Sequence, residues 1–187
     1  MTFDETRARA TGTLLLDQIK VSRELHGGSV VDAALAKLPP HIRQEIDHAL
    51  PTSWVPQEVG EAIHTAIAGE LGRDPLDFRR ELIRYALPRT FRTLWRVILR
   101  FTSDEALVAR CPMIFSKTYD RGKFTARIDT PGIASLRLME RPNASDLELV
   151  GISTAVETVL RLAGRRDVKV SWEKTPGGAS FLATWKA

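Results

Sequence analysis

The stretch that decides the fold is KFTARIDTPGIASLRL, residues 123–138. On both sides of the Pro131-Gly132 pair, apolar residues alternate with polar ones, as they do in strands with one buried face. The stretch therefore predicts a β-hairpin that turns one face toward a hydrophobic core. The apolar set consists of Phe124, Ala126, Ile128, Ala134, Leu136 and Leu138.

Downstream of this hairpin, the pattern predicts one helix and a second hairpin. Ser145 and Glu148 have the spacing of a capping box, and apolar residues at helical spacing continue to Gly164. Alternation then returns at 168–172 and 181–185, on either side of the TPGG turn. Residues of about 113–187 are therefore expected to form a β-β-α-β-β unit with an antiparallel sheet.

Upstream of the hairpin, the pattern is helical. Val59, Ile63, Ile67 and Leu71 recur every four residues, and glycine or proline pairs separate this helix from earlier ones. A further helical pattern runs from residue 74 to 101, with Pro88 expected to kink it, and a short helix is expected from 103 to Pro112. We therefore predict a single α+β domain over residues 1–187, with a helical N-terminal lobe over about 1–112.

The composition predicts a globular protein without a membrane span. The chain has 187 residues, of which 43% are hydrophobic and 27% charged, and its one cysteine, Cys111, excludes an internal disulfide. Its N-terminus does not have the pattern of a signal peptide, and no apolar run approaches about 18 residues. We therefore expect a cytoplasmic location.

Positive charge is concentrated in the second part of the chain. Residues 1–72 hold six Lys and Arg against ten Asp and Glu, a net charge of −4, whereas residues 73–187 carry +8. Four arginines recur at spacings of three, four and four, which places them on one helix face opposite an aromatic face. This stripe is the candidate site for an anion or a partner, because guanidinium groups suit carboxylate and phosphate. Its members are Arg89, Arg92, Arg96 and Arg100.

No motif predicts a catalytic centre or a metal site. The phosphate-binding, zinc-binding and nucleophile signatures are absent. His41 and His48 lie seven residues apart on one helix, which separates them by about 10 Å and prevents direct chelation of one ion. We therefore expect a protein that is not an enzyme and that has no metal.

The order of several short motifs resembles a paralogous family of myxobacterial proteins. These motifs are GTLLLDQIKVSRELHGG, ALAKLPP, SWVP, FSKTYDRGKF and FLATW, spread over residues 11–186. Trp54, Tyr119, Asp120 and Gly122 match recurrent family positions, and we expect structural roles for them. Trp54 is expected to fasten its loop to the core, and Gly122 to supply a positive φ in a turn.

That family is similar in its arrangement to vinyl-4-reductase-like domains and to heme-nitric-oxide/oxygen-binding (H-NOX) domains. The resemblance implies a regulatory or ligand-sensing domain. The heme-binding relatives use a histidine on a central helix and a Tyr-x-Ser-x-Arg signature. Here His64 is the last histidine of the chain, and KTYDRGK lacks the serine-arginine pattern. We therefore expect no cofactor, with heme on His64 as the alternative.

Taken together, the sequence predicts a non-enzymatic regulatory or adaptor domain. It is expected to act through a protein with an acidic surface, or through a small ligand bound between the helical lobe and the sheet. The alternatives are a nucleic-acid-binding protein that uses the basic helix face 89–100, and a sensor with heme or another prosthetic group. Pairing through the hairpin at 167–186 would make a homodimer.

Overall fold

The structure, a computed structural model, describes residues 8–90 and 102–186. Its first part is mainly helical, with a short antiparallel pair of strands, β1 and β2, that the sequence analysis did not predict. The elements are β1 (Arg9–Thr11), α1 (Gly12–His26), α2 (Gly28–Ala36), α3 (Pro40–Asp47), β2 (Trp54–Pro56), α4 (Gln57–Glu70) and α5 (Pro75–Thr90).

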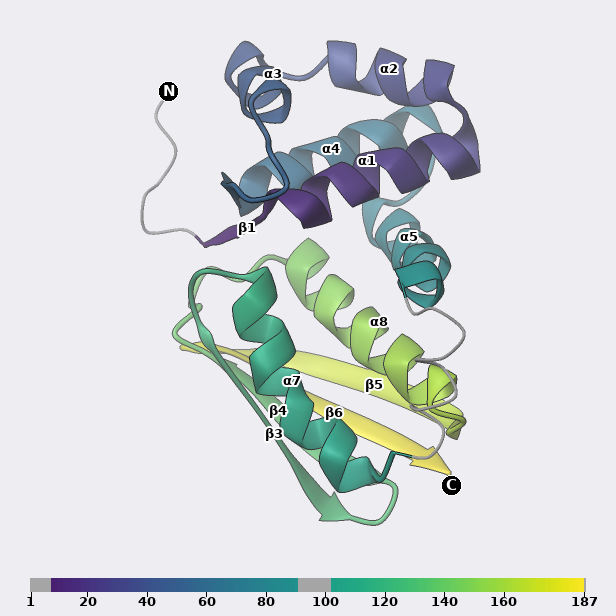
Figure 1. The fold of residues 1–187 in the computed structure, drawn as a ribbon, viewed down its shortest axis with the longest axis vertical. Helices are drawn as coiled ribbons and strands as arrows, with labels where there is room; N and C mark the ends of the chain where they lie inside the picture. The colour runs from purple at the N-terminus through teal and green to yellow at the C-terminus, as the bar shows by residue number, and fades with distance from the viewer. Residues whose placement is uncertain (1–7, 91–101, 187) are drawn as a thin grey trace.

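The second part is a four-stranded antiparallel sheet with two helices (Figure 1). Its elements are α7 (Asp104–Thr118), β3 (Lys123–Thr130), β4 (Ile133–Met139), α8 (Asp146–Leu162), β5 (Arg166–Thr175) and β6 (Gly178–Lys186). The strand order is β3-β4-β6-β5, and Phe124 lies opposite Leu138 across the predicted first hairpin. The α+β fold, with helices first and an antiparallel β-β-α-β-β unit after them, is therefore confirmed.

Side-chain caps fix the starts of three helices. Asp74 Oδ1 accepts from the backbone N–H groups of Leu76 and Asp77 at 2.9 and 3.0 Å. Ser103 caps α7 and Ser145 caps α8 in the same way, each accepting from the N–H group three residues later. These caps satisfy donors that have no partner inside the helix, so the local sequence sets where each helix begins.

Two helices continue through a proline: Pro88, where the sequence predicted a kink, and Pro112, where it predicted the end of a short helix. The helix α5 runs past Pro88 to Thr90, and α7 runs past Pro112 to Thr118. In α7, Val108 and Phe115 lie on either side of Pro112 and both belong to one core, where the Phe115 ring stacks on Phe124 at 5.2 Å. Burial of both turns offsets the hydrogen bond that the proline cannot make.

The buried apolar residues form two clusters rather than one. The first cluster lies among α1 to α5, from Leu15 to Leu82. The second cluster joins α7, α8 and the inner face of the sheet, from Leu107 to Trp185. The helices α5 and α8 pack against each other between the two clusters (Figure 1). In the described part of the chain, no helix combines the length and the apolar character that a membrane crossing requires.

Candidate functional site

Buried polar side chains gather where the two clusters meet. They come from α1, α4 and α5 on one side, and from α8 and the segment before it on the other. Burying charged groups is costly unless partners compensate them, so this concentration is a departure from ordinary packing. The fully or largely buried members are Gln18, His64, Arg79, Arg141 and Glu148.

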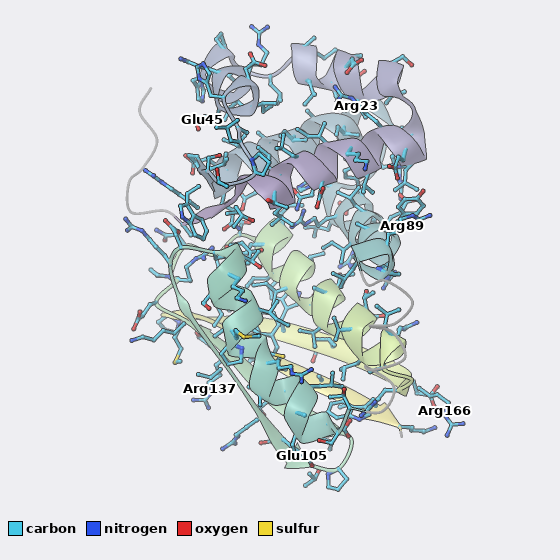
Figure 2. The ribbon with its side chains drawn as sticks, in the orientation of Figure 1. Arg23, Glu45, Arg89, Glu105, Arg137 and Arg166 are labelled. Carbon is cyan, nitrogen blue, oxygen red and sulfur yellow. The ribbon has the colours of Figure 1, made fainter. Side chains whose placement is uncertain are left out.

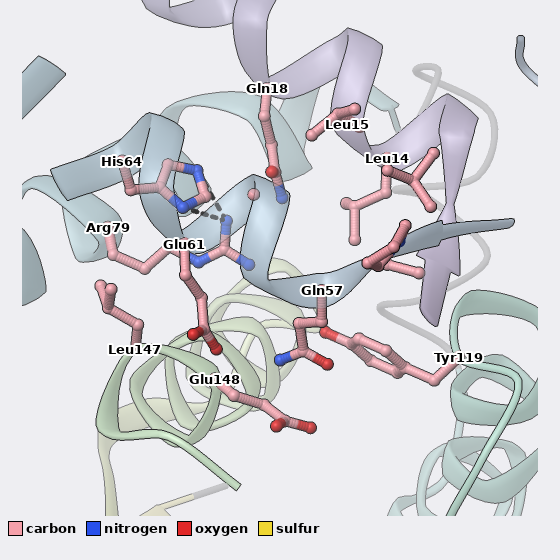
Figure 3. Close-up of a pocket in the computed structure, with 14 residues that line it drawn as sticks. Leu14, Leu15, Gln18, Gln57, Glu61, His64, Arg79, Tyr119, Leu147 and Glu148 are labelled. Carbon is pink, nitrogen blue, oxygen red and sulfur yellow. Dashed lines mark hydrogen bonds between the residues drawn. The ribbon is translucent and has the colours of Figure 1, made fainter. Parts of the chain in front are cut away.

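The centre of the group is a contact between His64 of α4 and Arg79 of α5. Their side chains are buried, with exposed fractions of 2% and 8%. Arg79 Nη1 lies 3.0 Å from His64 Nε2 and 3.5 Å from Nδ1 (Figure 3). Burial, and then the charge of Arg79, lower the pKa of His64 well below its usual 6.5. The imidazole is therefore neutral, and it accepts a hydrogen bond from the guanidinium.

A glycine of α8 makes room for this guanidinium. A Cβ atom on Gly151 would lie 3.1 Å from both Nε and Nη2 of Arg79. Within residues 8–90 and 102–186, no ion pair joins Arg79 to a carboxylate, and His64 is its hydrogen-bond partner. Burial lowers the pKa of Arg79, while more distant groups that include Glu61 raise it. The cation is thus held between two helices without a directly bonded anion.

A second buried arginine, Arg141, makes three side-chain hydrogen bonds. Arg141 Nη2 donates to the carboxylate of Glu148 and, at 2.6 Å, to Gln57 Oε1, while Nη1 donates at 2.9 Å to the carbonyl oxygen of Arg121. Burial raises the pKa of Glu148, and the charge of Arg141 and hydrogen bonds oppose that rise. These bonds join α4, α8 and the segment before β3 at one point.

Further polar contacts link the two clusters at the edges of the group. Ser145 donates its hydroxyl hydrogen to Glu61, and Arg84 of α5 lies 3.3 Å from Glu157 of α8. Asp120 Oδ1 accepts from the Arg9 N–H group at 2.7 Å. The lobes are therefore connected largely by hydrogen bonds and ion pairs, in addition to the packing of α5 on α8.

These side chains line a small, partly open cavity of about 30 Å³ (Figure 3). One water molecule needs about 10–15 Å³ of such space, so the cavity admits only a few water-sized atoms. The polar residues that line it are Gln18, Gln57, Glu61, His64, Arg79, Tyr119 and Glu148, with Leu14 and Leu15 among the apolar ones. A second cavity, of about 120 Å³, shares Gln57, Glu61 and Glu148 and extends toward Arg121 and Asn143.

The described part of the predicted arginine stripe lies outside the group of buried polar side chains. Arg89 lies exposed on α5 (Figure 2), donates to the Tyr85 carbonyl oxygen at 2.8 Å, and places its guanidinium 3.3 Å from the centre of the Tyr85 ring. Arg92, Arg96 and Arg100 lie outside the described residues. The stripe as an anion-binding surface therefore stays a prediction.

The four residues of the family motifs have different surroundings. Trp54 does not fasten its loop to the core, because it is 42% exposed while Val55 is buried at 3%. Successive residues of a strand point to opposite faces, and β2 turns Val55 inward. Gly122 has φ +90°, and a Cβ there would lie 2.6 Å from Arg141 Cγ. Tyr119 lines the cavity, and Asp120 bonds to Arg9 as described above.

The sequence analysis did not identify most of the buried polar group. His64 was named only as an alternative heme ligand, without a predicted place in the core, and its side chain is buried. Arg79 did not differ from the other arginines of a basic segment, and Arg141 belongs to an undistinguished turn. One signal was present in Gly151, since a glycine within a long predicted helix often has a packing reason. The described residues contain no cluster of three or more His, Cys, Asp or Glu that could hold a metal ion.

Comparison with known proteins gives a fold but no family. No family model and no curated protein sequence matches the chain. Solved structures of H-NOX proteins match it over 95% of its length. The Fe(II) unliganded H-NOX protein from K. algicida has a TM-score of 0.71 at 8% identity, with 97% of its own chain covered. An oxygen-binding H-NOX domain related to soluble guanylate cyclases has a TM-score of 0.61 at 17% identity, with 95% covered.

These comparisons overturn the expectation that the protein has no cofactor. A third similar structure, with a TM-score of 0.64, 16% identity and coverage of 95% of this chain and 99% of its own, is described in terms of heme redox potential and porphyrin distortion. The expectation was wrong because it used only the absence of motifs, and motifs do not report what a fold can enclose.

The described side chains do not, however, fit heme in their present arrangement. Sites for cofactors usually measure about 300–1,000 Å³, whereas the cavity beside His64 measures about 30 Å³. Both ring nitrogens of His64 face Arg79 Nη1, so neither presents a lone pair to an iron atom. The chain shares the fold of the H-NOX domains.

Proposed function

We propose that this protein is a non-catalytic sensor domain that binds a small group in the buried polar cavity between its lobes. The observation that carries the proposal is Arg79, a buried cation that lines this cavity without a bonded anion in the described residues. Clefts between lobes are frequent ligand sites, and perturbed buried charges often mark functional positions. The H-NOX-like fold supports a bound-group sensor better than the protein adaptor that the sequence first favoured.

The contacts around the cavity provide a route from binding to movement. Arg79 of α5 lies against Gly151 of α8, and the Arg84–Glu157 ion pair joins the same two helices. A group that draws the guanidinium toward itself would change the spacing of α5 and α8. Because each helix belongs to a separate apolar cluster, that change would move one lobe relative to the other.

The proposal can be tested by asking whether a bound group depends on the room that Gly151 provides. The full chain would be purified without denaturation, and its native mass and its visible absorption would be recorded before and after addition of hemin. In the Gly151→Ala variant, the new Cβ would lie 3.1 Å from the Arg79 guanidinium and displace it. We expect occupancy to fall at least several-fold in this variant.

Gly69→Ala is the matched control, because a Cβ there meets no atom within 4 Å. It should retain the occupancy of the unmodified chain. An absorption band or a bound mass that is lost in Gly151→Ala and kept in Gly69→Ala would place the bound group at the lobe junction. Equal occupancy in all three proteins would contradict the proposal. The proposal would also be contradicted if the purified chain carries no bound group and its hydrogen exchange in α5 and α8 does not change when hemin or small anions are added.

A further inference from the structure

The acceptors that line the cavity between the lobes already have donors of their own. Arg141 donates to Glu148 and to Gln57. Glu61 accepts from the hydroxyl group of Ser145. The negative charge of Glu148 is therefore compensated by an adjacent cation, and that of Glu61 is directed toward the N-cap of α8.

The donors that line the cavity are in the opposite situation. The Arg79 guanidinium has five N–H bonds, and among residues 8–90 and 102–186 it donates to His64. Gln18 is 9% exposed, and its side-chain amide has no hydrogen-bond partner in the same residues. Burial raises the pKa of Tyr119, so its hydroxyl keeps its hydrogen at neutral pH. Donors from three different elements thus line the same space as the carboxylates of Glu61 and Glu148.

The size and the charge of the cavity restrict what can occupy it. Its volume of about 30 Å³ is space for the centres of water-sized groups, and one water needs about 10–15 Å³ of such space, so the cavity admits two or three atoms of that size. Arg79 has a neutral histidine as its hydrogen-bond partner, and Glu61 and Glu148 act on its charge only from a distance, so burial still lowers its pKa. The partner that would compensate this cation most is an anion. Neutral water is the competing occupant, because it also accepts hydrogen bonds.

The geometry points to a binding site for a compact monovalent anion, of the size of chloride or formate, with Arg79 as its charge partner and Gln18 and Tyr119 as further donors. This inference rests on the proposed function, because it names the ligand class for the same cavity.

The test measures thermal unfolding of the full chain in sodium chloride, in sodium formate and in sodium gluconate at equal ionic strength. Gluconate has the same charge but is too large for the cavity. We expect a saturable rise in the unfolding midpoint with chloride or formate that gluconate does not produce. In Gln18→Met, the loss of one hydrogen bond to an anion should raise the apparent Kd of the anion about tenfold. Arg79→Met should abolish the effect.

Arg80→Met is the matched control, because Arg80 follows Arg79 in α5 but pairs at the surface with Asp77 at 2.6 Å. It should keep the response of the unmodified chain. If Arg79→Met does not fold, Gln18→Met decides, since it removes no charge. Equal midpoints in chloride, formate and gluconate would overturn the inference and leave water as the occupant. A different bound group in the native mass would also overturn it while the sensor function stands.

Discussion

Replacing Arg141 with methionine removes the cation from the most buried ion pair at the lobe junction. The two side chains are 7% and 3% exposed, so Glu148 would keep its place without its cation. The change also removes the bonds to Gln57 and to the Arg121 carbonyl oxygen. Breaking a buried pair from one side typically costs about 3–5 kcal/mol. We expect a loss of this size in the free energy of unfolding at pH 8.

The loss should depend on pH in a defined direction. Burial already raises the pKa of Glu148 above its ordinary 4.5, and Arg141 opposes that rise. Without Arg141 the pKa rises further, so the folded state keeps a proton that the unfolded state releases above about pH 4.5. Stability must then fall as the pH increases from that point. At pH 4.5 the variant should lose only about 1–2 kcal/mol, from the missing hydrogen bonds.

Urea unfolding of the unmodified chain and of Arg141→Met between pH 4.5 and 8 would measure this difference. Subtracting the two curves removes the titration of groups that both proteins share. Adding Glu148→Gln to the variant should recover most of the loss at pH 8, because the uncompensated charge is gone. Arg137→Met, at an exposed position of β4, should stay within about 0.5 kcal/mol of the unmodified chain. An equal loss at both ends of the pH range, or no recovery in the double variant, would refute the reasoning.

Three further predictions concern single side chains. Gly122→Ala should cost about 1–3 kcal/mol in urea unfolding, because φ is +90° there and the Cβ would lie 2.6 Å from Arg141 Cγ, whereas Gly177→Ala, with no atom within 4 Å, should cost much less. Burial raises the pKa of Cys111 to about 11, so only about a thousandth of its thiol is ionised at pH 8. A thiol reagent should therefore react slowly with the folded chain and faster with the chain unfolded in urea. The ring signals of His64 in NMR should not titrate between pH 5.5 and 7.5, because its pKa lies well below 6.5. The contribution of His64 to stability should be lost as the pH falls below about 6.5, because the unfolded state then takes up a proton that the folded state excludes. A ring that titrates near 6.5 would contradict its burial beside Arg79.

The parts of the fold that were predictable are those that local sequence determines. Strand alternation gave both hairpins, and short-range spacing placed the cap at Ser145. The continuation of α7 through Pro112 was not predictable in this way. It depends on Phe115 packing against Phe124, a contact across two elements that the periodicity of one element does not contain.

The candidate site was less predictable than the fold for the same reason. Gln57 and Glu148 both bond to Arg141, yet they lie 84 and 7 positions from it along the chain. An arginine in a basic segment reads as surface charge until its neighbours in space are known. Gly151 could have indicated a close approach of another element, but the sequence does not say that the element is α5 or that Arg79 fills the space.

The two apolar clusters also explain why the junction between them is the place where a bound group would have an effect. Each cluster is made of residues from one lobe, so its apolar contacts lie within that lobe. What resists movement of one lobe against the other is the packing of α5 on α8 together with the bonds of Arg79, Arg141, Arg84 and Ser145. Polar contacts of this kind change strength when charge is added or removed beside them, whereas a continuous apolar core would not respond. A small anion bonded to Arg79 therefore acts on the contacts that set the position of the lobes.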